Sequence, residues 1–146
     1  MNRVQHHFLK TRFTWYFVFC FGLIWLPGSV NAQSVQEIIS QIETLVATED
    51  VAALVDMAAD PLDIAAFGPS KTYSHTQGTF VLQEIFRSLD VRSFSIADHA
   101  VSDNGLFIQG DIGVAPSERP VRMYLRLKKS ASRWSIRELL FERKDQ

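Results

Sequence analysis

The apolar residues in the last third of the chain recur at every second position, and this period constrains the fold more than any other feature. Such a period places successive side chains on opposite faces of a strand. Short runs of turn residues separate the alternating stretches, and short links favour antiparallel neighbours. The pattern predicts a meander of four strands with one apolar face, formed by Phe94 and Ile96, by Leu106, Ile108, Ile112 and Val114, by Val121, Met123, Leu125 and Leu127, and by Trp134, Ile136 and Leu140.

The same region is rich in basic residues, because residues 121–143 hold seven basic side chains and two acidic ones. The basic residues of the third stretch alternate with apolar ones, as any half-buried strand requires. We therefore interpret them first as the solvated face of a strand and second as a candidate binding surface. That candidate surface consists of Arg122, Tyr124, Arg126 and Lys128.

The residues before the meander show helical spacing instead. Ser34 followed by Glu37 is the pattern of a capping box, and an apolar stripe runs through residues 35–47. A short second helix over residues 51–58 and a short strand over residues 62–67 are expected next. A third helix should start at Ser74 or Thr76 and bury Phe80, Val81, Ile85, Phe86 and Leu89.

The first 32 residues follow the order of a secretory signal peptide. Arg3, Lys10 and Arg12 come first without any acidic residue, an apolar run follows over residues 13–26, and small residues precede a cleavage site after Ala32. An uncleaved membrane anchor is the alternative, but a 14-residue helix rises only about 21 Å, against a hydrocarbon core of about 30 Å. We expect export to the periplasm or the extracellular space, with no membrane contact after cleavage.

Cleavage would leave residues 33–146 as a single domain without a thiol, because Cys20 leaves with the signal. That domain would hold 12 basic and 16 acidic residues, with a net charge of −10 before Arg119 and +6 from there on. An acidic domain argues against a nucleic-acid partner. The split predicts instead a homodimer through the sheet, which should also bury Tyr124 or Phe107 because surface ion pairs alone are weak.

The order of helix, short helix, short strand, helix and four-stranded meander resembles the nuclear transport factor 2-like (NTF2-like) superfamily. Within it, roughly residues 34–143 are similar to a family of small exported bacterial proteins of unknown function. The resemblance implies an α+β cone, in which the N-terminal helices pack on a curved antiparallel sheet, often around a pocket. The matching pieces are Gly68, Thr72-Tyr73-Ser74, Arg92-Ser93-Phe94, Val121 to Lys129, Trp134, Ile136 and Leu139.

Enzymes of this superfamily, such as the ketosteroid isomerases, place an aspartate base and tyrosine, histidine or acidic partners inside the cone. A base of this kind must be desolvated enough to accept a proton. The resemblance therefore makes Glu138, Asp63, Tyr73 and His99 candidate catalytic residues, while alternation places Asp111 and Tyr124 on the polar face as surface groups. For Tyr73 and His99 the simpler interpretations are a ring packed at the start of the third helix and an ordinary histidine near a turn.

Glu138 is the residue that breaks its pattern, because strict alternation after Trp134 and Ile136 places it on the apolar face. One interpretation is a β-bulge, after which Leu139 and Phe141 take over the core face. The other is a polar group that faces a cavity. The choice between them decides how strongly the residue is favoured as a catalytic base.

Three functions remain open at this stage. The first is a non-catalytic exported module that binds a small apolar ligand or a protein through its cone and sheet. The second is an enzyme of isomerase or hydrolase type that uses Glu138 or Asp63, and the third is a self-associating structural protein. No glycine-rich phosphate loop and no His/Cys/Glu set at metal-ligand spacing is found, so no cofactor and no metal are expected.

Overall fold

The computed structural model describes residues 33–116 and 118–144, so the expected signal peptide and the cleavage site after Ala32 lie outside the described residues. None of the helices in these two ranges is long and apolar enough to span a membrane. The described chain contains helices α1 (Val35–Ala47), α2 (Val51–Asp56) and α3 (His75–Leu89) and strands β1 (Ala58–Ala66), β2 (Lys71–Tyr73), β3 (Ser93–Val101), β4 (Gly105–Gly113), β5 (Val121–Ser130) and β6 (Arg133–Arg143).

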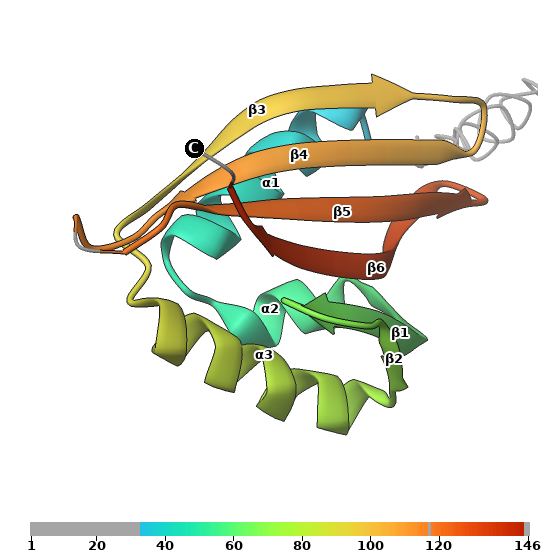
Figure 1. Ribbon diagram of the computed structural model, residues 1–146. Coiled ribbons are helices and arrows are strands. Elements are labelled where there is room, and N and C mark those ends of the chain that lie inside the picture. Colours follow the sequence, from blue (N-terminus) through green and yellow to red (C-terminus); the bar gives the residue numbers. More distant parts are fainter. Residues whose placement is uncertain (1–32, 117, 145–146) are drawn as a thin grey trace, which may run out of the picture.

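The six strands form one curved sheet, and the three helices lie on one side of it (Figure 1). The strand order is β2-β1-β6-β5-β4-β3. The predicted meander is confirmed, since β3, β4, β5 and β6 pair as antiparallel neighbours. The sheet as a whole is mixed, because β1 runs parallel to β6 while pairing antiparallel with β2. The expected α+β cone is therefore observed, with one parallel pair that the sequence pattern did not specify.

Helix α1 forms as its sequence predicts. The Ser34 hydroxyl accepts a hydrogen bond from the main-chain N–H of Glu37 at 3.2 Å, and the Glu37 carboxylate accepts one from the N–H of Ser34 at 2.9 Å. This capping box satisfies two of the donors that a helix start leaves unpaired. The apolar stripe of the helix enters the core through Ile38, Ile39, Ile42 and Val46.

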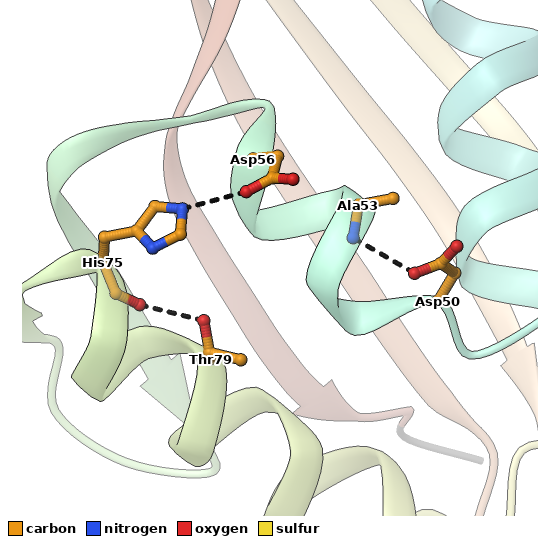
Figure 2. A network of polar contacts seen from close by, with 5 residues as sticks. All are labelled: Asp50, Ala53, Asp56, His75 and Thr79. Atoms are coloured by element: carbon orange, nitrogen blue, oxygen red, sulfur yellow. Dashed lines mark hydrogen bonds and ion pairs between the residues drawn. The ribbon is translucent and has the colours of Figure 1, made fainter.

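Figure 2 shows how α2 and α3 meet. The Asp50 carboxylate accepts a hydrogen bond from the N–H of Ala53 at 3.1 Å and caps α2. Helix α2 ends two residues before the expected boundary, because Ala58 already belongs to β1 and pairs with β6. Helix α3 starts at the Ser74 cap, and the ring of His75 contacts Asp56 at 3.2 Å, so that one polar contact joins the end of α2 to the start of α3.

One residue of α3 lies on the opposite side from the prediction. Phe80 was expected in the core, but its relative exposure is 67%. The buried side of the helix begins instead at Gly78 and continues through Leu82, Ile85, Phe86 and Leu89. A Cβ on Gly78 would lie 3.5 Å from the nearest atom of Leu62, so the glycine faces β1 and turns Phe80 toward solvent.

The space between helices and sheet is filled by apolar side chains. The buried apolar residues of β4 and β5 have 0–1% exposure, and in the described part of the chain no polar or charged residue is buried. The indole Nε1 of Trp134 is the only buried side-chain nitrogen or oxygen in residues 33–116 and 118–144 without a hydrogen-bond partner. The described core offers no ionisable group for chemistry inside the cone.

The sheet bends where β3 pairs with β4 near Gly110. Gly110 has no side chain, and the ring of Phe94 occupies the space above it, so that a Cβ there would lie 2.2 Å from Cζ of Phe94. A register shift between Ile96 and Asp98 adds a bulge at the same place. A bulge increases the local twist, and a glycine permits the close approach of a neighbouring ring. Together they let β3 curve over the core toward α1.

Replacing Gly110 with Ala should therefore destabilise the domain. The added methyl must displace a buried ring, and overpacking of this kind costs about 1–3 kcal/mol. Chemical denaturation measures the change in the free energy of unfolding. Gly78→Ala is the matched control: its new methyl makes an ordinary contact, and the gain in helix propensity should stabilise the domain by about 0.5–1 kcal/mol. Equal effects at the two glycines would contradict this explanation of the bend.

Candidate functional site

The outer face of the sheet, defined as the side away from the three helices, carries the clustered functional groups of the described chain. Strand register aligns its side chains in rows that cross β4, β5, β6 and β1. Two rows are charged, and an apolar row lies between them. The predicted basic surface is on this face, because Arg122, Tyr124, Arg126 and Lys128 all alternate with buried residues of β5.

The first charged row is built around Asp111. Arg122 Nε donates to one carboxylate oxygen of Asp111 at 3.0 Å, and Lys144 Nζ donates to the other at 3.0 Å. The hydrogen bond from Arg122 is the main cause that lowers the pKa of Asp111; Lys144 adds to it, and partial burial opposes both. The same contact, with a smaller contribution from Tyr124, raises the pKa of Arg122. Glu142 continues this row beside Arg122 on β6.

The second charged row contains two of the candidate catalytic residues. Arg126 Nη2 and Glu138 Oε2 are 2.9 Å apart, and Glu138 is the strand neighbour of Asp63. The Asp63 carboxylate accepts a hydrogen bond from the hydroxyl of Thr72 at 2.6 Å. At the other end of the row, Phe107 is the strand neighbour of Arg126. Two carboxylates therefore lie side by side, with a guanidinium on one flank and a hydroxyl on the other.

The row between them is apolar on β5, β6 and β1 and begins with Gln109 on β4. Tyr124 on β5 pairs with Leu140 on β6, and Leu140 pairs with Ala65 on β1. The ring of Phe107 stacks on Tyr124 with 5.8 Å between ring centroids and 29° between ring planes. Phe107 remains 43% exposed. The centre of the outer face thus presents aromatic and aliphatic surface surrounded by ion pairs.

A pocket of about 380 Å³ opens at one end of this face, where β1 and β6 both terminate. Phe67, Gly68 and Leu140 contribute its walls together with the last residues of β6. The guanidinium carbon of Arg143 lies 4.7 Å from the ring centroid of Phe67. The pocket therefore combines an exposed aromatic ring with one cation and with the carboxylate of Glu142.

The bulge predicted for Glu138 is confirmed. The pairing of β5 with β6 shifts register between Arg126 and Leu127, after which Leu139 and Phe141 take the core positions. Glu138 consequently lies on the outer face, 33% exposed, and not against the apolar core. The alternative in which it faces a cavity in the cone is wrong.

The four candidate catalytic residues are not brought together. Asp63 and Glu138 are neighbours on the outer face, whereas Tyr73 pairs with Leu62 and packs against the core from the edge strand β2. His99 is exposed on β3, the opposite edge of the sheet. The sequence had no signal for the neighbour of Asp63 on β6, because parallel pairing of β1 with β6 is not encoded in either strand alone.

The sequence also gave no signal for several other parts of this face. Lys144 follows the last strand and carries no pattern of its own, and the contact of Arg143 with Phe67 depends on the backbone of Phe67, whose φ of 56° no local motif announces. Leu140 was expected on the core face; the bulge turns it outward. The exposure of these groups follows from strand pairing and not from strand composition.

The His75 cluster is a second polar group, and its geometry is structural. Figure 2 shows the hydroxyl of Thr79 donating to the main-chain carbonyl of His75 at 3.0 Å, not to the ring. A hydroxyl nucleophile would need the imidazole as its hydrogen-bond partner. The Asp56, His75 and Thr79 arrangement therefore joins two helices and does not form a catalytic triad. Across residues 33–116 and 118–144, no group of three or more His, Cys, Asp or Glu side chains is placed to hold a metal ion.

Solved structures similar to this chain share its fold. A DUF4783 family protein from Bacteroides ovatus is 18% identical with a TM-score of 0.66, over 72% of this chain and 94% of that one. A second, from Bacteroides uniformis, is 14% identical with a TM-score of 0.66, over 73% and 97%. An NTF-2-like protein of unknown function from Silicibacter pomeroyi is 10% identical with a TM-score of 0.54, over 75% and 92%. At such identities the likeness concerns the fold alone.

Comparison with curated proteins gives no match. The model of the family described as a domain of unknown function, DUF4783, matches residues 39–142. That range contains α2, α3, most of α1 and the meander up to Glu142 in β6, together with both charged rows up to the same residue. The chain therefore belongs to the DUF4783 family, and its fold is NTF2-like.

Proposed function

We propose that this chain is an exported, non-catalytic binding module that associates with protein through the outer face of its sheet, and that a second copy of the chain is its first partner. The observation that carries the proposal is the stacked pair of Phe107 and Tyr124, left partly exposed at the centre of that face beside Leu140. Protein interfaces typically have an aromatic and aliphatic centre and a polar rim. The two charged rows supply such a rim.

Catalysis by Glu138 or Asp63 is the competing proposal, and the surroundings of these carboxylates do not favour it. A general base with a raised pKa needs an apolar, water-poor site. Glu138 instead faces Arg126 on an open surface, and Asp63 accepts a hydrogen bond from Thr72. Neither carboxylate is buried among apolar side chains, and each has a polar partner, as is usual for polar groups on a protein surface.

The proposal predicts a salt-sensitive dimer in sedimentation measurements. Tyr124→Asp places a charge at the centre of the interface and should raise the dissociation constant about tenfold or more, as for the loss of a central aromatic anchor. Phe80→Asp is the matched control, because Phe80 is an exposed phenylalanine on α3, away from the outer face. A mass beginning at Gln33 in the same sample would support export. A monomer at high concentration and low salt would contradict the proposed association.

The proposed dimer requires that ion pairs hold the charged side chains of the rim in place. The ion pairs of Asp111 with Arg122 and Lys144 can be tested by the dependence of stability on pH. The pKa of Asp111 is lowered in the folded chain from the ordinary value of 3.8, so its contribution to stability is present above that pH and is lost as the pH falls through the folded value. Asp111→Asn should reduce the free energy of unfolding by about 1 kcal/mol at pH 7, and the difference from the unmodified chain should shrink as the pH falls below 3.8.

Denaturant titrations at pH 7, 5, 3 and 2 would measure this difference. Asp103→Asn, which removes the same charge in the exposed turn between β3 and β4, is the control and should have little effect at any pH. A loss at Asp111 that stays constant down to pH 2 would show that Arg122 and Lys144 do not act on the ionised carboxylate.

The pocket at the end of β1 and β6 favours a second candidate, a small apolar ligand with an acidic group. Phe67 and Leu140 offer apolar contact, and Arg143 offers a positive charge. Such a ligand would bind on the outer surface and not inside the cone, because the described core is filled by apolar side chains.

Anilinonaphthalene sulfonate, an apolar dye that carries an anion, is a suitable probe of this pocket. Its fluorescence should rise on saturable binding, and Phe67→Ala should weaken that binding about tenfold, the value of burying one phenyl ring. Phe80→Ala, the removal of an exposed ring elsewhere, should leave the titration unchanged. Equal loss in both variants would mean that the dye reads general exposure and not the pocket.

A further inference from the structure

The charges of the outer face are sorted by strand. On β5 the outward residues of the two charged rows are basic, and on β6 they are acidic. Each basic residue lies directly beside an acidic one, and the apolar pair of Tyr124 and Leu140 lies between the two charged pairs. The matched pairs are Arg122 with Glu142 and Arg126 with Glu138.

This pattern restricts how two copies can pack face to face. A closed symmetric dimer of two sheets needs a two-fold axis that lies between them and parallel to their planes. If the axis runs across the strands through Tyr124, each strand faces itself in reverse, so that Arg122 lies over Arg126 of the second copy. If the axis runs along β5, each arginine lies over its own copy. Both arrangements oppose like charges, which is costly at an interface.

An axis along the strands between β4 and β5 brings some opposite charges together but leaves others without a partner. It places Arg122 over Asp111 of the second copy, yet it turns β6 toward the second copy's β3. The residues of β3 that pair with the outward residues of β4 are Ser95, Asp98 and Ala100, and none of them is basic. Glu138 and Glu142 would then have no cation opposite them.

An axis along the strands between β5 and β6 matches the charged and apolar pairs of these two central strands. It places β5 of one copy over β6 of the other, so that basic residues face acidic ones and the aromatic ring of Tyr124 faces the aliphatic side chain of Leu140. It also places β1 over β4, so that Ala65, which is 3% exposed, faces Gln109, and Asp63 faces the exposed ring of Phe107. Each contact occurs twice, as a two-fold axis requires.

We propose that two copies of this chain associate face to face about a two-fold axis that runs along the strands between β5 and β6. The inference rests on the proposed function and adds the register of the partner. In this register Arg126 and Glu138 of one copy, already 2.9 Å apart, form a closed ring of alternating charges with the same pair of the second copy. Networks of several charges stabilise a structure more than isolated surface ion pairs do.

The register is tested by distances between spin labels at the two ends of one row. Ala100 on β3 and Thr72 on β2 close the row that passes through Phe107, Arg126, Glu138 and Asp63, and both are exposed. Ala100→Cys and Thr72→Cys would each be made in a Cys20→Ser background, expressed from the full-length sequence and purified as the cell processes it. Pulsed electron resonance then measures the distance between the two labels of the dimer at each site.

With the axis between β5 and β6, both sites are equally far from it, and each pair of labels should be separated laterally by about 24 Å, five strand spacings. An axis along β5 would shorten the Ala100 distance and lengthen the Thr72 distance, with a difference of about 10 Å between them. An axis across the strands would leave both labels displaced only along the strand, by about 13 Å. Two similar distances of about 24 Å would support the register. Distances that differ by about 10 Å, or two distances of about 13 Å, would overturn it.

The sign of a charge reversal gives an independent measurement. Arg126→Glu should weaken the dimer about tenfold or more, because the new side chain opposes Glu138 of the second copy, and the double variant with Glu138→Arg should restore it. Arg87→Glu on α3 is the matched control and should have no effect. A dimer strengthened by Arg126→Glu would overturn the register in favour of the axis across the strands.

Failure of the inference and failure of the proposed function are distinguishable. A dimer whose label distances differ by about 10 Å contradicts the register but leaves association through the outer face intact. A chain that remains monomeric at high concentration and low salt contradicts both. Melting curves of each labelled variant, compared with that of the unmodified chain, establish that the measured protein is folded.

Discussion

The bulge in β6 is the constraint on which the rest of the outer face depends. Arg137 is the extra residue between Ile136, which pairs with Leu127, and Glu138, which pairs with Arg126. Its insertion changes which residues of the strand face the helices, so that Leu139 and Phe141 complete the core. The same change turns Glu138, Leu140 and Glu142 outward. Without it, a carboxylate would be buried without a partner, which costs several kcal/mol or forces protonation.

The bulge also determines how β1 joins the sheet. Parallel pairing aligns Asp63 with Glu138 and Ala65 with Leu140, and the register of β1 against β6 is itself irregular between Ala58 and Asp63. The irregular stretch follows α2, where the N–H of Ile136 donates to the carbonyl of Met57. The carboxylate pair, the apolar row and the pocket near Phe67 therefore all follow from one inserted residue in the last strand. Two adjacent carboxylates on this fold invite a catalytic interpretation, but here they result from the register.

The sequence predicted those parts of the fold in which a local pattern determines the structure. The capping box at Ser34, the stripe of α1 and the four strands of the meander depend on neighbours in the chain and were predicted correctly, except that the bulge in β6 turned Leu140 outward. The orientation of Phe80 on α3 was predicted wrongly. The side of the helix that contains Gly78 approaches β1, because a glycine permits close contact there, and Phe80 consequently faces solvent. The start of β1 at Ala58, the short β2 and the parallel pairing were also missed, since they depend on strands distant in sequence. The candidate site was predicted residue by residue on β5, whereas its neighbours on β1 and β6 required the register.

The division of charge along the chain does not become a division of charge in space. The C-terminal segment carries a net +6 and the preceding one a net −10, yet Arg122 lies between acidic residues of β4 and β6. The basic stretch therefore does not present the continuous positive surface that nucleic-acid backbones select. In the proposed dimer, the alternating basic and acidic strands would instead select one register of the second copy. A displacement of that copy by one strand would place like charges opposite each other and convert attraction into repulsion. In the proposed dimer, salt should screen the exposed ion pairs but not the contact between Tyr124 and Leu140, so that the apolar row would supply affinity while the charged rows would determine alignment.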